Sequence, residues 1–334
     1  MTRITIKDIA KELHLHHSTV SRALRNDARV NEITRKKVVD FAESSGYQVN
    51  MSALQLRGNT RNVIAVIVPN INHNFFSNIV STITNKAFEH GYMVSVFQSN
   101  EKYEQEAAII NTVIQHNIAG VIASVSMETH HSDHFKKLKK FKIPLVFFDR
   151  ICEDLNVSKV LVNNAEIVEE AVEMLIRNKC TKIAHITGPQ KLNVFRERQK
   201  GYLNALDNSG LDYRETLFLD QAFNIDIGKN AMSELLALPY PPDGLICDSN
   251  VLLTGVLLEL KRRELKVPED ISVIGFSDHP FVEAFTPGVI CIVQPDTEIA
   301  ICAFDLLWRI MNEDEFGKPE TITVSAQIVN NYTF

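Results

Sequence analysis

Short apolar runs alternate with segments of helical periodicity from Val63 onward, and this alternation constrains the fold more than any other feature. The first four runs begin 25–29 residues apart. Repeats of this length are typical of βαβ units, in which helices cover both faces of a parallel sheet. The expected strands are Val63–Val68, Tyr92–Phe97, Gly120–Val125 and Leu145–Phe148, and the helices between them are Phe75–Glu89, Glu104–His116 and Asp133–Phe141.

A second set of apolar runs follows the first, again with helical segments between them. The two sets together exceed what one doubly wound sheet usually holds, so we expect two lobes. Ligands of such folds bind at the carboxyl ends of strands, which makes the cleft between the lobes the expected ligand site. The second set of runs comprises Val160–Val162, Lys182–Ile186, Leu217–Leu219, Gly244–Cys247 and Ser272–Gly275.

The charge of the chain is divided unevenly between its beginning and the rest. Residues 1–61 hold 11 Lys/Arg against 6 Asp/Glu, a balance of +5, whereas the whole chain has a net charge of −6. A basic N-terminal segment on an acidic body suggests a polyanionic partner for that segment. Without a supporting motif, the same imbalance could be an ordinary fluctuation of surface charge.

Three short amphipathic helices supply such a motif. We expect them at Ile6–Leu13, His17–Leu24 and Thr34–Ser44, with Asn31 as the N-cap of the third. The second helix carries a polar and basic outer face, which together with the first gives a helix-turn-helix pattern that fits a DNA major groove. The alternative from periodicity alone is a three-helix packing module with a solvated face.

A short helical stretch from Asn50 to Gly58 follows these helices. A helix of this length is marginal in water, so we expect it to fray unless it docks on a partner.

Several classes of protein are disfavoured by what the sequence lacks. No apolar run is long enough to span a membrane, and charges near Met1 argue against a signal peptide, so we expect a cytoplasmic protein. Five cysteines without a CxxC pair fit a reducing compartment. No phosphate-binding loop, nucleophile elbow or HExxH motif indicates an enzyme, and we expect no cofactor. The His130–His134 segment is a weak metal candidate because lysines follow it, so we expect no metal site.

The strings TIKDIAKEL, STVSRAL and RVNEITRKKVVDFAESSGYQVN resemble the DNA-binding head of the LacI/GalR (lactose/galactose repressor) family. The later strings IAVIVPNINHNFF, IPLVFFDR, HITGP, ERQKGYLNAL, VPEDISVIGFSD and FTP resemble the sugar-binding core of that family, so the resemblance covers essentially the full chain. It implies a helix-turn-helix head, a hinge helix and a periplasmic-binding-protein-like core of two parallel doubly wound sheets.

The resemblance also implies which residues contact DNA. The base-reading candidates are His17, Ser18 and Arg22; the phosphate contacts and cap residues are Thr5, His16, Thr19, Ser21, Arg25, Asn31 and Tyr47; and the hinge residues are Asn50, Ala53 and Leu56. Leu56 would wedge between base steps in the minor groove, and its alternative is simple packing against the core. The chain departs from the family pattern at His14, His16, Arg25 and Leu54, which puts the turn and the cap of the second helix in doubt.

The effector contacts implied by the resemblance are Phe75, Asp149, Arg150, Arg198, Phe223, Ser249, Asn250 and Asp278. Guanidinium and carboxylate groups give directional bonds to hydroxyls, and an aromatic ring can cover the apolar side of a sugar. The two phenylalanines could instead be ordinary core residues, and Asp149 with Arg150 could be a structural ion pair. Ser249-Asn250 replaces the Asn-Asp of the family, so no relative's effector is transferred.

The expected organisation has three parts: a DNA-binding domain at 1–47, a hinge at 48–61 and a core at 62–334. Within the core we expect an N-lobe of about 62–160 plus 292–328, and a C-lobe of about 161–291. The expected function is a sequence-specific transcriptional regulator, a repressor in this prediction, that binds a pseudo-palindromic operator as a homodimer. A sugar or sugar phosphate in the cleft would control it. The alternatives are a solute-binding protein of a transporter and an activator of the same fold.

Overall fold

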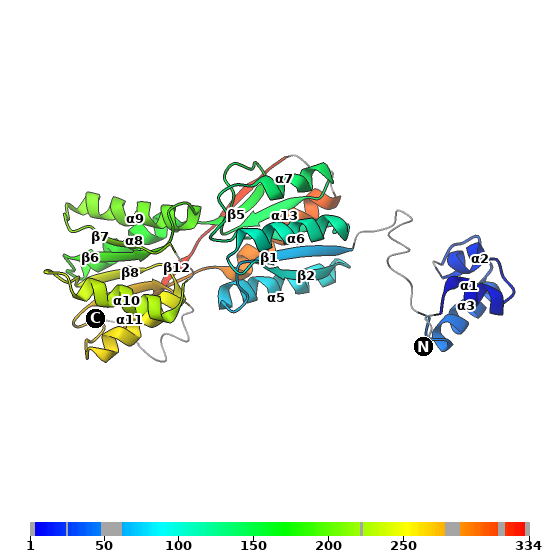
Figure 1. Cartoon of the computed structure of the whole chain (residues 1–334), viewed down its shortest axis with the longest axis horizontal. Helices are drawn as coiled ribbons and strands as arrows, with labels where there is room; N and C mark the ends of the chain where they lie inside the picture. Colours follow the sequence, from blue (N-terminus) through cyan, green and yellow to red (C-terminus); the bar gives the residue numbers. More distant parts are fainter. Residues whose placement is uncertain are drawn as a thin grey trace. The chain divides into compact units, whose positions relative to one another are not determined.

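A computed structural model of the chain describes residues 4–24, 26–47, 62–220, 223–277, 288–312 and 318–330. The chain divides into two compact units, Met1–Arg61 and Asn62–Phe334, which we describe one at a time (Figure 1). The site predictions for Arg25, Asn50, Ala53, Leu56 and Asp278 fall outside the described residues.

The first unit contains the helices α1 (Ile6–Glu12), α2 (His17–Ala23) and α3 (Glu32–Ser44). They pack around a small buried core that includes Ile9 and Val20. The expected start of the third helix was two residues late, because Asn31 accepts a hydrogen bond from the Thr34 backbone N–H and so caps a helix that begins at Glu32.

The turn between α1 and α2 requires a left-handed residue, and His14 supplies it with a φ of 52°. Glycine adopts this conformation without a Cβ penalty, whereas histidine is one of the few other residues enriched there. The departure from the family pattern at this position therefore keeps the turn, at the cost of some backbone strain.

The first lobe of the core is a six-stranded parallel sheet with the order β11-β5-β4-β3-β1-β2. Helices α5, α6 and α7 connect its first strands, and α13 packs beside α5. The strands are β1 (Val63–Val68), β2 (Met93–Gln98), β3 (Gly120–Ala123), β4 (Leu145–Phe148), β5 (Ser158–Val162) and β11 (Thr321–Val324), and the helices are α5 (Asn74–Glu89), α6 (Tyr103–Gln115), α7 (Asp133–Lys140) and α13 (Asp296–Asn312).

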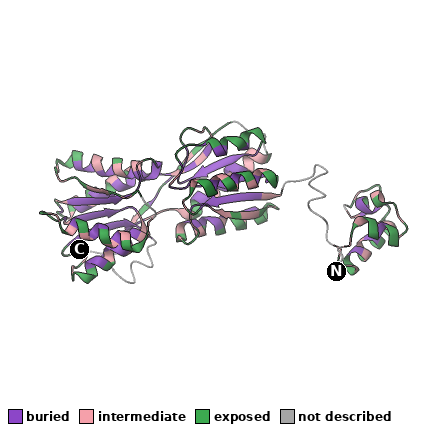
Figure 2. Cartoon of the chain, in the orientation of Figure 1, coloured by how far each residue is buried: buried purple, intermediate pink, exposed green. Residues whose placement is uncertain are grey.

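The second lobe is a six-stranded sheet with the order β12-β10-β9-β8-β6-β7, parallel except for the β10–β12 pair. In both lobes the inner strands are buried and the helices expose their outer sides (Figure 2), whereas the edge strands β2 and β7 are partly exposed. The strands are β6 (Ile183–Thr187), β7 (Glu215–Phe218), β8 (Gly244–Cys247), β9 (Ser272–Phe276), β10 (Ile290–Val293) and β12 (Gln327–Val329), and the helices are α8 (Asn164–Arg177), α9 (Asn193–Ser209), α10 (Ile225–Leu236) and α11 (Asn250–Arg262).

The chain passes between the lobes at three places, near residues 163, 294–295 and 325–326. The Asn163 side chain accepts a hydrogen bond from the Ala326 backbone N–H at 2.8 Å, so two of these crossings are tied together.

The segment Thr321–Val329, most of which was expected in the N-lobe range 292–328, needs correction. It is two strands in different sheets: β11 joins the first lobe, and β12 pairs antiparallel with β10 of the second lobe. The apolar pattern runs on through the crossing, so periodicity could not show the break. The expected N-lobe segment 292–328 therefore includes parts of β10 and β12 that belong to the second lobe, and the expected boundary at residue 160 falls within β5.

Candidate functional site

The outer face of α2 presents most of the side chains expected to reach DNA. His17 and Arg22 are exposed, and Ser18 and Thr19 are half-buried. Ser21 is buried, with 7% of its surface exposed, and its phosphate contact stays a prediction. Both α1 and α3 pack on α2, so the covered side of this short helix is wider than its apolar residues alone suggested.

His16 is the N-cap of α2, a position where the sequence left capping in doubt. Its Nδ1 accepts a hydrogen bond from the Ser18 backbone N–H at 3.4 Å and lies 2.8 Å from the Ser18 hydroxyl. The rings of His16 and His17 lie 4.1 Å apart. The side chains that open α2 are therefore held by local contacts within the head.

Three expected phosphate contacts also have structural tasks in the head. The Thr5 hydroxyl donates to the Asp8 carboxylate, and the two residues form a reciprocal cap of α1. Asn31 caps α3 through its side-chain oxygen. Tyr47 is half-buried against the core of the head. Thr5 and Asn31 thus cap helix ends, and the phosphate contacts of all three residues stay predictions.

A cavity of about 150 Å³ lies between the two lobes of the core, at the carboxyl ends of the strands. Loops after β1 and β3 line one side, and loops after β6 and β8 line the other. In each sheet the order of the strands reverses between these two strands, β1 and β3 in the first lobe and β6 and β8 in the second. Such a reversal point is the usual ligand position in open α/β sheets. The structure brings seven expected effector residues to this cavity: Phe75, Asp149, Arg150, Arg198, Phe223, Ser249 and Asn250.

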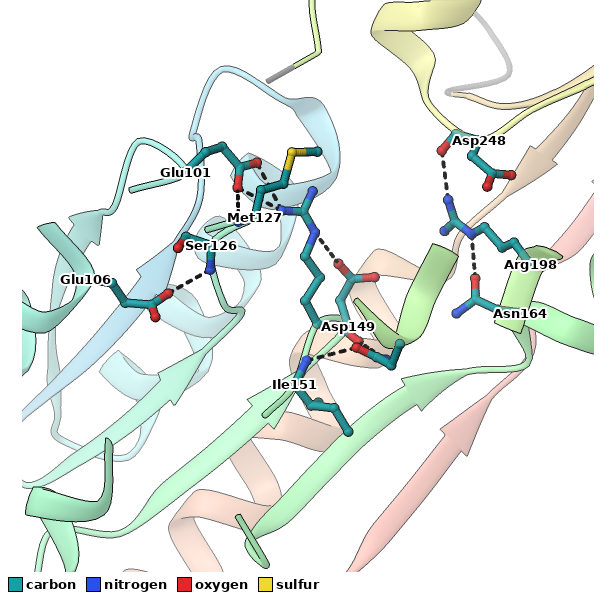
Figure 3. A network of polar contacts seen from close by, with 11 residues as sticks. Glu101, Glu106, Ser126, Met127, Asp149, Ile151, Asn164, Arg198 and Asp248 are labelled. Carbon is teal, nitrogen blue, oxygen red and sulfur yellow. Dashed lines mark hydrogen bonds and ion pairs between the residues drawn. The ribbon is translucent and has the colours of Figure 1, made fainter. Parts of the chain in front are cut away.

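Arg198 is the most constrained of these side chains, with 4% of its surface exposed. Its Nε donates to Asn164 Oδ1 at 2.8 Å, and its Nη1 donates to the Asp248 carbonyl at 2.7 Å (Figure 3). Burial lowers its pKa, and nearby carboxylates oppose that effect. An arginine stays charged even so, so a fixed cation faces the cavity.

Arg150 is buried on the first-lobe side and pairs with Glu101 rather than mainly with Asp149. Its Nη1 donates to both oxygens of Glu101, at 3.0 and 2.9 Å, whereas its Nε lies 3.9 Å from Asp149 Oδ2. Glu101 also accepts a hydrogen bond from the Met127 backbone N–H at 2.8 Å. The loops after β2, β3 and β4 are thus joined through one carboxylate.

Asp149 is buried and has a left-handed backbone, with a φ of 57°. Burial raises the pKa of Asp149, although Arg150 and Arg198 lower it. A strained backbone that persists at a cleft indicates a position held for function rather than stability.

Asp248 follows β8 directly and shapes the second-lobe side of the cavity. Its carbonyl accepts from Arg198, and its carboxylate accepts a hydrogen bond from the Thr187 hydroxyl at 2.5 Å. Its other carboxylate oxygen lies 3.0 Å from His185 Nε2. Both parts of Asp248 are therefore committed to positioning its neighbours.

Asn193 connects the lobes at the start of α9. Its side-chain amide donates to the Asp149 carbonyl at 2.9 Å and accepts from the Ile151 backbone N–H at 3.0 Å. The neighbouring Val194 and Phe195 pack into the core of the first lobe. The helix that carries Arg198 is consequently anchored on both lobes.

Sequence reasoning missed several residues that line the cavity. Glu101 and Asp248 follow β2 and β8, so the same strand-end rule that found Asp149 could have found them. Phe195 and Phe276 looked like ordinary core residues, and their aromatic type gave no further signal. The missed lining residues with side chains of chemical interest are His73, Phe76, Glu101, Phe195, Asp248, Phe276 and Asp296.

The His130–His134 segment, named above as a weak metal candidate, is partly buried. His134 is buried and its Nε2 lies 2.8 Å from Glu106, whose carboxylate also accepts from the Ser126 backbone N–H and the Thr129 hydroxyl. Apolar neighbours on α7 carry His134 inward. Among the described residues, no group of three His, Cys, Asp or Glu side chains could hold a metal ion.

No helix within the described ranges is both long enough and apolar enough to cross a membrane.

Comparisons with known proteins cover both units of the chain. Residues 5–50 match the family described as "Bacterial regulatory proteins, lacI family". Residues 61–328 match the family described as "Periplasmic binding proteins and sugar binding domain of LacI family".

One relative and two solved structures agree with these family matches. The HTH-type transcriptional repressor CytR of Escherichia coli (strain K12) is 31% identical over 99% of this chain and 97% of its own length. The structure of the lac repressor dimer bound to operator and the anti-inducer ONPF is similar, with a TM-score of 0.84 at 19% identity over 98% of both chains. A regulator from Alkaliphilus metalliredigens QYMF complexed with D-xylulofuranose has a TM-score of 0.70 at 24% identity, over 80% of this chain and 97% of its own.

Proposed function

Because the chain belongs to the lacI family of bacterial regulatory proteins, we propose that it represses transcription from a pseudo-palindromic operator. A homodimer would place two α2 helices in successive major grooves, with the hinge segments between them. A small-molecule effector, a sugar or sugar phosphate, would occupy the cavity between the lobes and control operator affinity. The members of this family are regulators rather than enzymes, and the protein would act in the cytoplasm.

The observation that carries this proposal is the single cavity where seven expected effector side chains from both lobes meet. A ligand that contacts both lobes has a different affinity for each arrangement of the lobes. It can therefore shift the equilibrium between them by that difference in free energy.

The head supports the DNA-binding half of the proposal. The exposed His17 and Arg22 lie five residues apart on α2, and a major groove admits an α-helix together with its side chains. An arginine can form two hydrogen bonds with guanine, which is worth about 1–3 kcal/mol of discrimination against other bases.

A solute-binding protein of a transporter is the second candidate function. The core alone would fit that role, but a transport protein has no use for a helix-turn-helix unit. An activator of the same fold differs from a repressor only in where its operator lies, so it shares the residues argued above.

Selection of binding sites from random DNA by the full chain tests the proposal. We expect enrichment of a two-fold symmetric site. Arg22→Ala should relax the preference at one position of each half-site, whereas Lys36→Ala, an equal loss of charge at an exposed position of α3, should leave the preferred sequence unchanged. Enrichment of no symmetric site would contradict the proposal.

A further inference from the structure

We propose that Glu101 makes the cavity selective for uncharged polyhydroxy ligands, by neutralising Arg150 and leaving the lining with an excess of carboxylates. The inference rests on the proposed function, since it assigns a ligand class to the effector cavity. Of the two ligand classes named above, it favours the uncharged sugar over the sugar phosphate.

The charges that line the cavity are unequal. Among the described lining residues, the carboxylates are Glu101, Asp149, Asp248 and Asp296, and the guanidiniums are Arg150 and Arg198. Burial lowers the pKa of His73, the remaining titratable side chain of the lining, which keeps this imidazole uncharged at neutral pH. The lining therefore holds more carboxylates than guanidiniums before any ligand arrives.

Glu101 offsets the charge of Arg150 before any anion arrives. Both oxygens of Glu101 accept from its Nη1, and the two side chains are only 10% and 15% exposed. Charge-assisted bonds of this kind are about twice as strong as neutral ones and strengthen further away from water. A phosphate or carboxylate would have to displace Glu101 to bond with Nη1.

The backbone shows that Glu101 is held in this position. Asn100 and Glu101 are consecutive left-handed residues, with φ values of 52° and 61°. Residues other than glycine rarely adopt this conformation, and strain of this kind clusters at ligand-binding sites. The turn directs Glu101 toward Arg150 and toward the Met127 backbone N–H.

Arg198 is suited to hydroxyl groups rather than to a full negative charge. Its Nε and Nη1 are bound to neutral acceptors, the Asn164 amide oxygen and the Asp248 carbonyl, and one further terminal nitrogen, Nη2, has no partner among the described residues. Asp149 stands beside it as an acceptor for ligand hydroxyls. Against the effect of burial, Asp248 and Asp149 raise the pKa of Arg198 and so already offset its positive charge. A phosphate here would therefore meet Asp149 with no uncompensated cation beside it, and burial of an unpaired charge is costly.

Aromatic rings complete the ligand class. Phe75, Phe195 and Phe223 line the cavity, and the rings of Phe195 and Phe223 meet edge to face at 5.6 Å. Such rings pack on the apolar face of a sugar. Free pentoses or hexoses and nucleosides share this chemistry, because both carry hydroxyls, an apolar face and no charge.

Matched pairs of ligands test the selectivity directly, with thermal stability and calorimetric titration of the full chain as readouts. The pairs are ribose and ribose 5-phosphate, galactose and galacturonate, and cytidine and its 5′-monophosphate. We expect at least one uncharged compound to bind about tenfold or more tightly than its charged partner. Comparison of the sugars with the nucleoside shows which of these two classes of uncharged compound the cavity binds.

The role of Glu101 is tested by Glu101→Gln, with Glu104→Gln as the matched control. Glu104 is exposed on α6 and does not line the cavity, so both variants lose one negative charge but only one of them frees Arg150. We expect the preference for the uncharged partner to fall about tenfold in Glu101→Gln and to stay within about twofold in Glu104→Gln.

Three results would overturn the inference: tighter binding of the charged partner, binding of no uncharged compound, or an unchanged preference in Glu101→Gln. The panel on the wild-type chain gives a decisive result even if the variant folds poorly. The DNA selection described above is independent of these titrations. A chain that binds uncharged sugars but enriches no symmetric site would contradict the proposed function and leave the selectivity intact.

Discussion

The guanidinium carbon of Arg198 lies 3.4 Å from the centre of the Phe276 ring. The ring belongs to β9, whereas Arg198 belongs to α9, and the ring supports the cation from one side. Together with the bonds to Asn164 and Asp248, this contact fixes the guanidinium before a ligand arrives. Such preorganisation improves affinity, since less ordering is needed on binding.

Arg198→Lys should weaken effector binding by roughly 10- to 100-fold, because an ammonium cannot reproduce the directional fork of a guanidinium. Isothermal titration with the tightest ligand of the panel measures the loss. Arg177→Lys is the matched control, since Arg177 is exposed on α8 and pairs only with Glu173 among the described residues. Equal affinities in the wild type and Arg198→Lys would remove Arg198 from the binding site.

Asn193→Ala should lower the free energy of unfolding of the core by about 2 kcal/mol or more, because it leaves the Asp149 carbonyl and the Ile151 N–H buried without partners. Urea denaturation measures the change. Asn208→Ala, at an exposed position of the same helix, should cost far less. A loss no larger than that of Asn208→Ala would show that Asn193 does not anchor α9.

The sequence was sufficient to predict the fold class, since the alternation of strands and helices and the periodicity of each helix can be read from residues close together in the sequence. The family resemblance implied Asp149 and Ser249 as effector contacts, and both line the cavity at strand ends, because parallel strands bring their carboxyl ends together.

Contacts between side chains far apart along the chain could not be predicted from the sequence. An ion pair with Asp149 was the alternative that the sequence offered for Arg150, but the bonded partner of Arg150 is Glu101, 49 residues away. His134 looked exposed beside lysines, yet the carboxylate of Glu106 holds it inside. In the same way, Ser21 looked exposed because the width of the helix packing around α2 cannot be read from one helix. Side-chain partners in the folded chain decided each of these cases.

His16→Ala should destabilise the first turn of α2 by about 0.5 kcal/mol, the low end for N-cap loss, because the cap bond is long at 3.4 Å. Native-state hydrogen exchange should then be faster at the Ser18 amide. His16→Ser should restore protection, and His17→Ala should leave it unchanged. Unaltered exchange in His16→Ala would mean that the imidazole does not cap the helix.

His73 should make the core less stable in mild acid. Burial and the charge of Arg150 lower its pKa below the ordinary value of 6.5. Below pH 6.5 the unfolded chain therefore binds more protons at this residue than the folded chain, so stability falls as the pH drops toward the lower folded value.

Urea midpoints between pH 8 and pH 5 measure this dependence. The slope should be smaller in His73→Asn than in the wild type. His116→Asn, which removes an exposed histidine, should keep the wild-type slope. Parallel curves for the wild type and His73→Asn would contradict the expectation.

The account as a whole depends on coupling between the cavity and the head, and the operator affinity of the full chain with and without saturating effector measures that coupling most directly. We predict a change of about tenfold, within the usual range of allosteric coupling, and the loss of that change in Arg198→Lys with operator binding retained. The same operator affinity at zero and at saturating effector would contradict the account.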